Sequence, residues 1–307
     1  MIGQEFVQLS LTPILVGILA SLACALPGNF LLLRRQTLIG DAISHVVLPG
    51  IVAAFLISGS IAAWPMMLGA SGAALFAVLM IEAIKRFGRI ESGAAMGVVF
   101  TSMFAGGVLL LEQSDTSSVH LDVQHALYGN LESLIWLSAD GWGSLFDPAA
   151  LSEMPPQVGR LIVVLALVVA FIAIFWLPLK IATFDESFAL SIGIPARLLG
   201  FALVALTAIG AVAAFDAVGS IIVIAMFICP AATARLMTDD LFVQVLLSAL
   251  FAVLSAVLGY VLAGYLPALL GYDYAVSAAG MMATVSGLVL GVACLFGPKR
   301  TRVAPTA

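Results

Sequence analysis

The sequence predicts an all-α, polytopic membrane protein with about nine transmembrane helices. Of its 307 residues, 63% are hydrophobic and 9% are charged, whereas a soluble domain carries about 25% charged residues. The apolar runs are continuous for about 20 residues, which as helices can cross the roughly 30 Å of bilayer hydrocarbon. The strands of a membrane barrel would instead alternate in segments of about 10 residues. We therefore expect residues 1–307 to form a single helical transmembrane domain.

Each long apolar run is a candidate span. The runs lie near 11–33, 38–58, 62–84, 94–112, 158–179, 198–215, 217–236, 241–264 and 276–297. Only a minimal turn, marked by Asp216 and Gly219, separates the sixth run from the seventh. Eight spans plus a re-entrant segment is therefore the alternative to nine.

The basic residues predict the orientation, because Lys and Arg concentrate on the cytoplasmic side of a membrane protein. If the first span runs from outside to inside, eleven of the twelve Lys and Arg residues are cytoplasmic and Arg160 is the exception. The amino terminus is then outside and the carboxyl terminus is cytoplasmic. The first ten residues contain Glu5 and no basic residue, so they do not resemble the positive end of a cleavable signal peptide.

The loop at 113–157 is expected to be extracytoplasmic, and it is acidic. It contains no Lys or Arg, and its acidic residues are Asp115, Asp122, Glu132, Asp140, Asp147 and Glu153. Such a surface raises the local concentration of cations. The alternative is that this loop lacks basic residues simply because outer loops often do.

The same loop contains His120 and His125. Asp122 and His125 would share a helix face, whereas His120 and Asp122 would share one only in an extended strand. A metal site at Asp122 and His125 and a solvated loop with incidental histidines both remain open. The apolar stretch 131–137, with tryptophans nearby, suits a short helix at the membrane interface.

Asp41 and His45 are the candidate functional pair. An aspartate in a transmembrane helix costs about 2.5–3.5 kcal/mol, so it usually faces an interior and serves a function. A carboxylate and an imidazole at positions i and i+4 lie on one helix face and make half of a site for a divalent transition metal. Pro49 displaces the His45 carbonyl, which becomes available beside them. The alternative is that Asp41 caps the helix and His45 bonds a neighbouring helix.

Catalytic and redox signatures are missing. Cys24, Cys229 and Cys294 are isolated, with no Cys-x-x-Cys pair. The chain has no phosphate-binding loop, no His-Glu-x-x-His and no Gly-x-Ser-x-Gly. Any ATP-driven work therefore requires an ATPase on another chain.

The segment 180–197, expected on the cytoplasmic side, predicts a short amphipathic helix. Thr183, followed by two acidic residues, is a reasonable helix start, Gly193 a helix stop, and Pro195 the start of the next helix. The alternative is a plain connection between spans.

Three segments resemble the permease subunit of the metal-type ABC importers, which carry manganese, zinc or iron(II) into bacteria. They are Gly-Asp-Ala-Ile-Ser-His at 40–45, Phe-Asp-Glu-Ser-Phe-Ala at 184–189 with Gly193, and Phe-Asp-Ala-Val-Gly-Ser at 215–220 leading to Pro-Ala-Ala-Thr-Ala at 230–234. The resemblance spans essentially the whole chain, and the first block is highly specific.

The resemblance implies a multi-pass protein of the bacterial inner membrane, surrounded by lipid and without a nucleic-acid partner. Its partners would be a second permease, in a homodimer or heterodimer, two cytoplasmic ATPase subunits that bind ATP, and an extracytoplasmic metal-binding protein. The chain itself would be non-catalytic and hold no permanent cofactor. Asp41 and His45 from two protomers would supply four ligands to the transported ion. The loop with Asp122 and His125 most resembles the manganese and iron branch, which ranks manganese first and zinc or iron(II) as alternatives.

The resemblance also implies roles for other residues. The coupling contacts with the ATPase would come from Phe184, Asp185, Glu186, Ser187, Phe188 and Gly193. Pro49 and Pro230 would serve gating, and Pro230 is expected to break its span and free the Met226 carbonyl. Asp216 is either a second metal waypoint or a turn residue.

Two other classes compete with this interpretation. An ATP-independent secondary transporter or channel would typically show more intramembrane carboxylates or inverted repeats. A membrane-embedded enzyme would use Ser44 with His45, but adjacent residues diverge on a helix.

Overall fold

A computed structural model describes residues 2–59, 63–113, 131–271 and 276–298. Within those ranges, nine helices are long and apolar enough to cross a membrane, which confirms the predicted number. They are formed by α1 and α2 (joined through the π-helical η1), α3, α4, α5, α8, α11, α12, α13 and α14. The bounds are α1 Ile2–Phe6, η1 Val7–Leu11, α2 Thr12–Leu33, α3 Ile39–Ser58, α4 Ala63–Gly88, α5 Ser92–Gln113, α8 Pro156–Ile174, α11 Ala196–Val218, α12 Ser220–Met237, α13 Leu241–Leu269 and α14 Ala278–Phe296.

Several boundaries differ from the predicted ones by a few residues, and the first and fifth spans are two examples. The first span begins at Gln4 rather than near residue 11. The span predicted at 158–179 ends at Ile174, and a separate helix α9 (Trp176–Phe184) follows. Pro178 explains the second difference, because it has no N–H to donate to the carbonyl of Ile174.

Gly219 alone joins α11 to α12. Its backbone has φ 79° and ψ 172°, a conformation that glycine adopts at little cost and other residues rarely adopt. The single residue therefore ends one span and begins the next, and the sixth and seventh runs are two complete helices.

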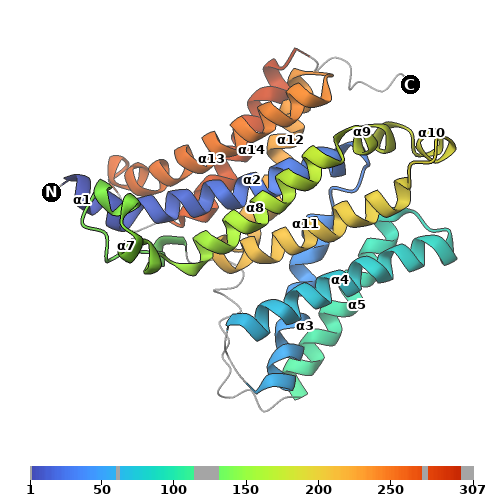
Figure 1. Ribbon diagram of the computed structural model, residues 1–307, viewed down its shortest axis with the longest axis horizontal. Helices are drawn as coiled ribbons and strands as arrows, with labels where there is room; N and C mark the ends of the chain where they lie inside the picture. The colour runs from blue at the N-terminus through green and yellow to red at the C-terminus, as the bar shows by residue number, and fades with distance from the viewer. Residues whose placement is uncertain (1, 60–62, 114–130, 272–275, 299–307) are drawn as a thin grey trace.

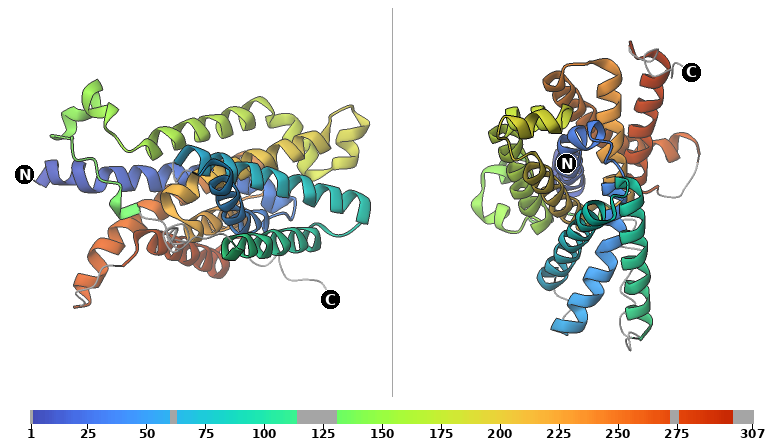
Figure 2. Two further views of the ribbon diagram at one scale, coloured as in Figure 1. Left: turned by 90° about the horizontal axis from the view of Figure 1, so that it is seen from below. Right: turned by 90° about the vertical axis from the view of Figure 1, so that its right-hand side faces the viewer.

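Helices α3, α4 and α5 pack together as a three-helix unit at one side of the molecule (Figure 1). This unit contacts the remaining helices chiefly through α11, and the right-hand view of Figure 2 shows it set apart from them. Around α2, on the other side, pack α8, α11, α12 and α13. The three-helix unit carries the candidate pair on α3.

Glycines bring α3 very close to its neighbours. A Cβ on Gly69 of α4 would collide with the Ala54 side chain and the Gly50 carbonyl of α3, and a Cβ on Gly107 of α5 would lie 2.6 Å from Cβ of Pro49. Small residues at such contacts allow membrane helices to pack by close van der Waals contact. The position of α3 within its unit therefore depends on these glycines.

The predicted break at Pro230 is wrong, because α12 continues through this residue as one helix. Proline removes one backbone hydrogen bond, and packing against neighbouring helices lets a membrane helix tolerate that loss. Pro230 is indeed buried. Pro49 likewise lies inside a continuous α3.

The predicted interfacial helix at 131–137 is also wrong. Only Leu131–Ser133 forms a helical turn, the 3₁₀ segment η3. Trp136 is fully buried beside Val7, and its indole N–H donates to the carbonyl of Ala150 at 2.9 Å. Two short helices follow Trp136, η4 (Trp142–Phe146) and α7 (Pro148–Ser152). The buried hydrogen bond ties the segment after η3 to α7, which contains Ala150.

The two ends of the bundle differ in the charged residues that they carry. Helices α1 and α7 lie at one end, and α9 and α10 (Glu186–Ser191) lie at the other (Figure 1). We call the latter the basic end, because Arg34, Lys85 and Arg197 line a common cavity there. The opposite end, which we call the acidic end, includes Asp140, Asp147 and Glu153 beside η4 and α7.

Candidate functional site

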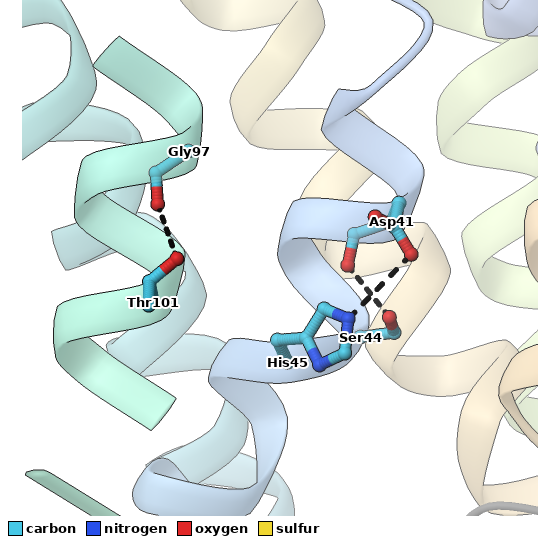
Figure 3. Close-up of polar contacts among 5 residues, drawn as sticks. All are labelled: Asp41, Ser44, His45, Gly97 and Thr101. Atoms are coloured by element: carbon cyan, nitrogen blue, oxygen red, sulfur yellow. Dashed lines mark hydrogen bonds and ion pairs between the residues drawn. The ribbon is translucent and has the colours of Figure 1, made fainter. Parts of the chain in front are cut away.

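Asp41 and His45 lie together on α3. The Asp41 Oδ1 and the His45 Nε2 are 3.6 Å apart, and the two side chains are 38% and 42% exposed. Figure 3 shows both side chains on the same side of the helix. The Ser44 hydroxyl donates to the backbone carbonyl of Asp41 at 2.6 Å, so it engages the main chain rather than the carboxylate.

The alternative that Asp41 caps the helix is wrong. The residue at the N-cap of α3 is Leu38, which makes no side-chain capping hydrogen bond. Asp41 is the third residue inside the helix, where a negative charge interacts favourably with the positive end of the helix dipole. Its carboxylate oxygens therefore remain available to a ligand.

Two phenyl rings of α5 orient the imidazole of His45. The Phe100 ring is stacked on it, with centroids 5.3 Å apart and planes inclined by 19°. The Phe104 ring meets it edge-on at 5.6 Å. Sequence reasoning missed both residues, although their spacing of four on a predicted span places them on one face.

The described part of the chain offers only these two donors at this position. No group of three or more His, Cys, Asp or Glu residues that could hold a metal ion occurs in the ranges that the structure covers. Thr101 and Ser102, the two residues after Phe100 on α5, are both exposed. Thr101 donates to the carbonyl of Gly97 at 2.6 Å (Figure 3).

Asp216 lies elsewhere and has a cationic partner. It is in the last turn of α11, whose first turn is at the basic end, whereas Asp41 lies in the first turn of α3 just after Arg34. The Arg160 guanidinium of α8 forms an ion pair with the Asp216 carboxylate and also donates to the Met67 sulfur at 2.7 Å. Sequence reasoning treated Arg160 only as an exception to the charge pattern.

The segment 184–193 forms the short helix α10. Asp185 caps it by accepting the N–H of Phe188 at 2.8 Å, while Thr183 belongs to α9, so the predicted helix start at Thr183 is wrong. Gly193 ends the segment with φ 82°. The Phe184 and Phe188 side chains are both more than half exposed at this end of the bundle.

Asp122 and His125 lie outside the described residues, so the structure contributes nothing on the predicted metal site in the loop.

Known proteins share both the sequence and the fold of this chain. The model of the ABC 3 transport family matches residues 6–136 and 154–297. The chain is 39% identical over 285 residues to the manganese transport system membrane protein MntD of Bacillus subtilis, covering 93% of this chain and 91% of that protein. It is 34% identical over 288 residues to the zinc transport system membrane protein TroD of Treponema pallidum, covering 93% and 73%.

A solved structure, PsaBC from Streptococcus pneumoniae in complex with Fab, contains a chain that matches this one with a TM-score of 0.74 and 27% identity. The match covers 94% of this chain and 92% of that chain. The chain therefore belongs to the ABC 3 transport family, as a multi-pass, non-catalytic membrane subunit.

Proposed function

We propose that this chain is the permease subunit of an ATP-driven importer of divalent transition metal ions, with manganese as the favoured cargo. The observation that carries the proposal is the pair of Asp41 and His45, 3.6 Å apart and both more than one third exposed on a membrane-spanning helix. Exposing a carboxylate and an imidazole to lipid is costly, so a partner surface or an aqueous pathway must cover them.

A second copy of the permease, or a related one, completes the site. One chain supplies one carboxylate and one imidazole here, and two protomers facing each other across an axis supply four ligands. The exposed hydroxyl side chain of Thr101 on α5 suits such a contact, because small and hydroxyl side chains favour packing between membrane helices. Residues 1–307 act as one transmembrane domain within this dimer.

The ligand chemistry suits several metals. Oxygen and imidazole donors without thiolate fit manganese, iron(II) and zinc. Relatives named for manganese and for zinc both match along most of the chain. We rank manganese first because the MntD protein of Bacillus subtilis has the higher identity, and zinc or iron(II) import is the alternative.

The basic end faces the cytoplasm in this proposal, with the amino terminus outside and the carboxyl terminus inside. Two ATPase subunits dock on the segment 180–197, where Asp185 caps α10 and the side chains of Phe184, Glu186, Ser187 and Phe188 are exposed. Gly193 ends this segment in a conformation suited to glycine. An extracytoplasmic binding protein delivers the metal to the acidic end.

Transport proceeds by alternating access. ATP binding moves the coupling segments, and the two permeases rearrange around their axis. Asp41 and His45 hold the dehydrated ion only transiently, because a conducting site must also release it. Pro49 and Pro230 lack one helical hydrogen bond each and lower the cost of bending α3 and α12.

The acidic end attracts cations before they enter. Asp122 and His125 belong to this outer loop and are further candidate ligands. Asp216 is a possible waypoint, and the paired guanidinium of Arg160 must move away before the carboxylate binds a metal.

Uptake into proteoliposomes tests the proposal. The vesicles contain the permease, its ATPase and its binding protein, and manganese uptake is measured with and without ATP, with zinc and iron(II) as competitors. We expect ATP-dependent uptake that Asp41→Asn and His45→Gln abolish while the complex stays assembled. Ser44→Ala is the matched control, because the Ser44 hydroxyl donates to the main-chain carbonyl of Asp41 and not to its carboxylate, so the variant should keep its uptake.

Other outcomes would redirect the proposal. Uptake without ATP would contradict the ABC mechanism and favour a secondary transporter or channel. Full uptake in Asp41→Asn and His45→Gln would place the metal pathway elsewhere, with Asp216 as the next candidate. Loss of uptake through loss of the assembled complex would count against a ligand role.

A further inference from the structure

A cavity of about 340 Å³ lies at the basic end, between the three-helix unit α3–α5 and the wall formed by α9, α10 and α11. Asp41 and His45 do not line it: the α3 residues that do are Ile39, Ala42, Ile43 and Val46, on another face of the helix. Phe100 of α5 lies between the two places, because it lines the cavity and also stacks on His45. The proposed transport mechanism assigns no ligand to this cavity, although Glu186 in its lining belongs to the segment proposed to dock the ATPase.

The residues that line the cavity change from charged to apolar along the helices. Charged residues line the cavity where helices begin or end, and they are Arg34, Arg35, Glu82, Lys85, Glu186 and Arg197. One to two turns farther into the bundle the lining is apolar, with Val46 of α3, Ala77 and Val78 of α4, and Phe201 and Val204 of α11. The cavity is therefore polar at the depth of the membrane surface and apolar at the depth of the acyl chains.

The charges at the cavity mouth do not balance. Lys85 Nζ lies 2.9 Å from the Glu82 carboxylate, and Arg197 Nε lies 3.8 Å from that of Glu186. These pairs leave the guanidinium groups of Arg34 and Arg35 as an excess of positive charge.

Arg34 is held firmly in this position. A Cβ added to Gly200 would lie 2.7 Å from Arg34 Nη1, so the guanidinium packs against the α11 backbone. Burial lowers the pKa of the Arg34 guanidinium, and the nearby Glu186 and Glu82 carboxylates act in the opposite direction. Arginine stays protonated despite such shifts, so a partly desolvated cation faces the cavity.

Unpaired polar atoms also meet at this cavity. Gln36 Oε1, Ser92 Oγ and Thr183 Oγ1 are buried and have no hydrogen-bond partner among the described residues. They come from the α2–α3 turn, the start of α5 and the end of α9, and all three residues line the cavity. These three residues add polar side chains to the lining near the mouth of the cavity.

We propose that this cavity binds an anionic phospholipid. Its phosphate lies against Arg34 and Arg35, and an acyl chain follows the apolar lining between α4 and α11. Basic pockets between membrane helices bind lipid headgroups in this manner. A free phosphate would satisfy the guanidinium groups but would leave the apolar depth of the cavity unfilled, which favours a lipid. The bound lipid joins the three-helix unit to the segment next to α10.

The experiment measures lipid binding by the permease assembled with its ATPase, after delipidation in neutral detergent. Phosphatidylglycerol, phosphatidylcholine and inorganic phosphate are titrated separately, thermal unfolding is followed, and retained lipid is counted by native mass spectrometry. We expect a saturable rise in the unfolding temperature and retention of phosphatidylglycerol alone. An equal effect of phosphatidylcholine, or of inorganic phosphate, would overturn the proposal.

Arginine variants locate the binding. Arg34→Gln and Arg35→Gln should each weaken phosphatidylglycerol binding about five-fold, the effect of one basic residue near a membrane surface. Arg235→Gln is the matched control, because Arg235 lies in the last turn of α12 at the same end, faces Asp239 and does not line the cavity. Should Arg34→Gln fail to fold, the exposed Arg35 decides the test alone. Equal binding by Arg35→Gln and Arg235→Gln would overturn the proposal.

Discussion

The imidazole of His45 stacks on the phenyl ring of Phe100, with ring centroids 5.3 Å apart. This contact joins α3 to α5 at the candidate metal pair. The Phe104 ring contacts the same imidazole edge-on from a second direction. A ligand whose ring is held in one orientation loses less freedom when it binds a metal. The aromatic rings therefore position His45 without themselves offering a donor to the ion.

Phe100→Leu should weaken metal binding while leaving the metal ligands unchanged. An aromatic pair contributes about 0.5–1.5 kcal/mol beyond its buried area, so the expected loss of metal affinity is about two- to ten-fold. Metal binding to the assembled transporter and the KM for uptake measure this effect. Phe76→Leu on α4 serves as the control, since Phe76 is 54% exposed. Equal losses in both variants would show that the effect does not come from the stacking on His45.

Gly69→Ala should destabilise the three-helix unit. The added Cβ would meet the Ala54 side chain and the Gly50 carbonyl of α3, and such overpacking typically costs about 1–3 kcal/mol. Thermal unfolding in detergent measures the loss. Gly72→Ala, on the same helix but with open space around the added Cβ, is the matched control and should leave the unfolding temperature nearly unchanged. Similar losses in the two variants would point to a general effect on α4.

Arg160 and Asp216 should show coupled stability. Removing the guanidinium alone leaves a half-buried carboxylate without its partner, so Arg160→Gln should cost more than the double variant Arg160→Gln/Asp216→Asn. The coupling energy of such a partly exposed pair should be about 1 kcal/mol. A double-mutant cycle of unfolding free energies measures it, and additive effects would mean that the ion pair does not stabilise the fold.

The same ion pair also bears on transport. If Asp216 is a waypoint, freeing its carboxylate should lower the KM for manganese by up to about five-fold in Arg160→Gln. The double variant, which has no carboxylate at this position, should not show that gain. An unchanged KM in Arg160→Gln would remove Asp216 from the metal pathway.

Asp185→Ala should uncouple ATP hydrolysis from metal uptake. The Asp185 carboxylate accepts the Phe188 N–H at 2.8 Å, and losing such a cap costs about 1 kcal/mol, a large share for a helix of 6 residues. Uptake per ATP hydrolysed by the assembled transporter measures the coupling. Asp185→Asn keeps a capping side chain and should restore most of it. If Asp185→Asn does not restore the coupling, the loss comes from the missing charge of Asp185 and not from the missing helix cap.

Several features of this fold were accessible from the sequence because they depend on local properties. The length of each apolar run predicted the nine spans. The spacing of four residues predicted that Asp41 and His45 share a face of α3. Gly193 was correctly expected to end the short segment before α11, since its φ is 82°.

Two predictions were wrong because contacts between distant residues overrode a local preference. Trp136 was expected at an interface, but its buried N–H found the Ala150 carbonyl 14 residues away. Pro230 was expected to break its span, and the surrounding helices hold α12 continuous through it. Competition between local preference and tertiary packing decided both cases, and packing prevailed.

The sequence by itself determined the membrane class, the number of spans and the candidate metal pair, because hydrophobic length and helical spacing act within one segment. Only the tertiary structure decided that Phe100 covers His45, that Arg160 pairs with Asp216 across 56 residues, and that Gln36, Ser92 and Thr183 line one cavity. These relationships join different helices, whose contacts follow from close packing of side-chain shapes and not from any periodicity along the chain.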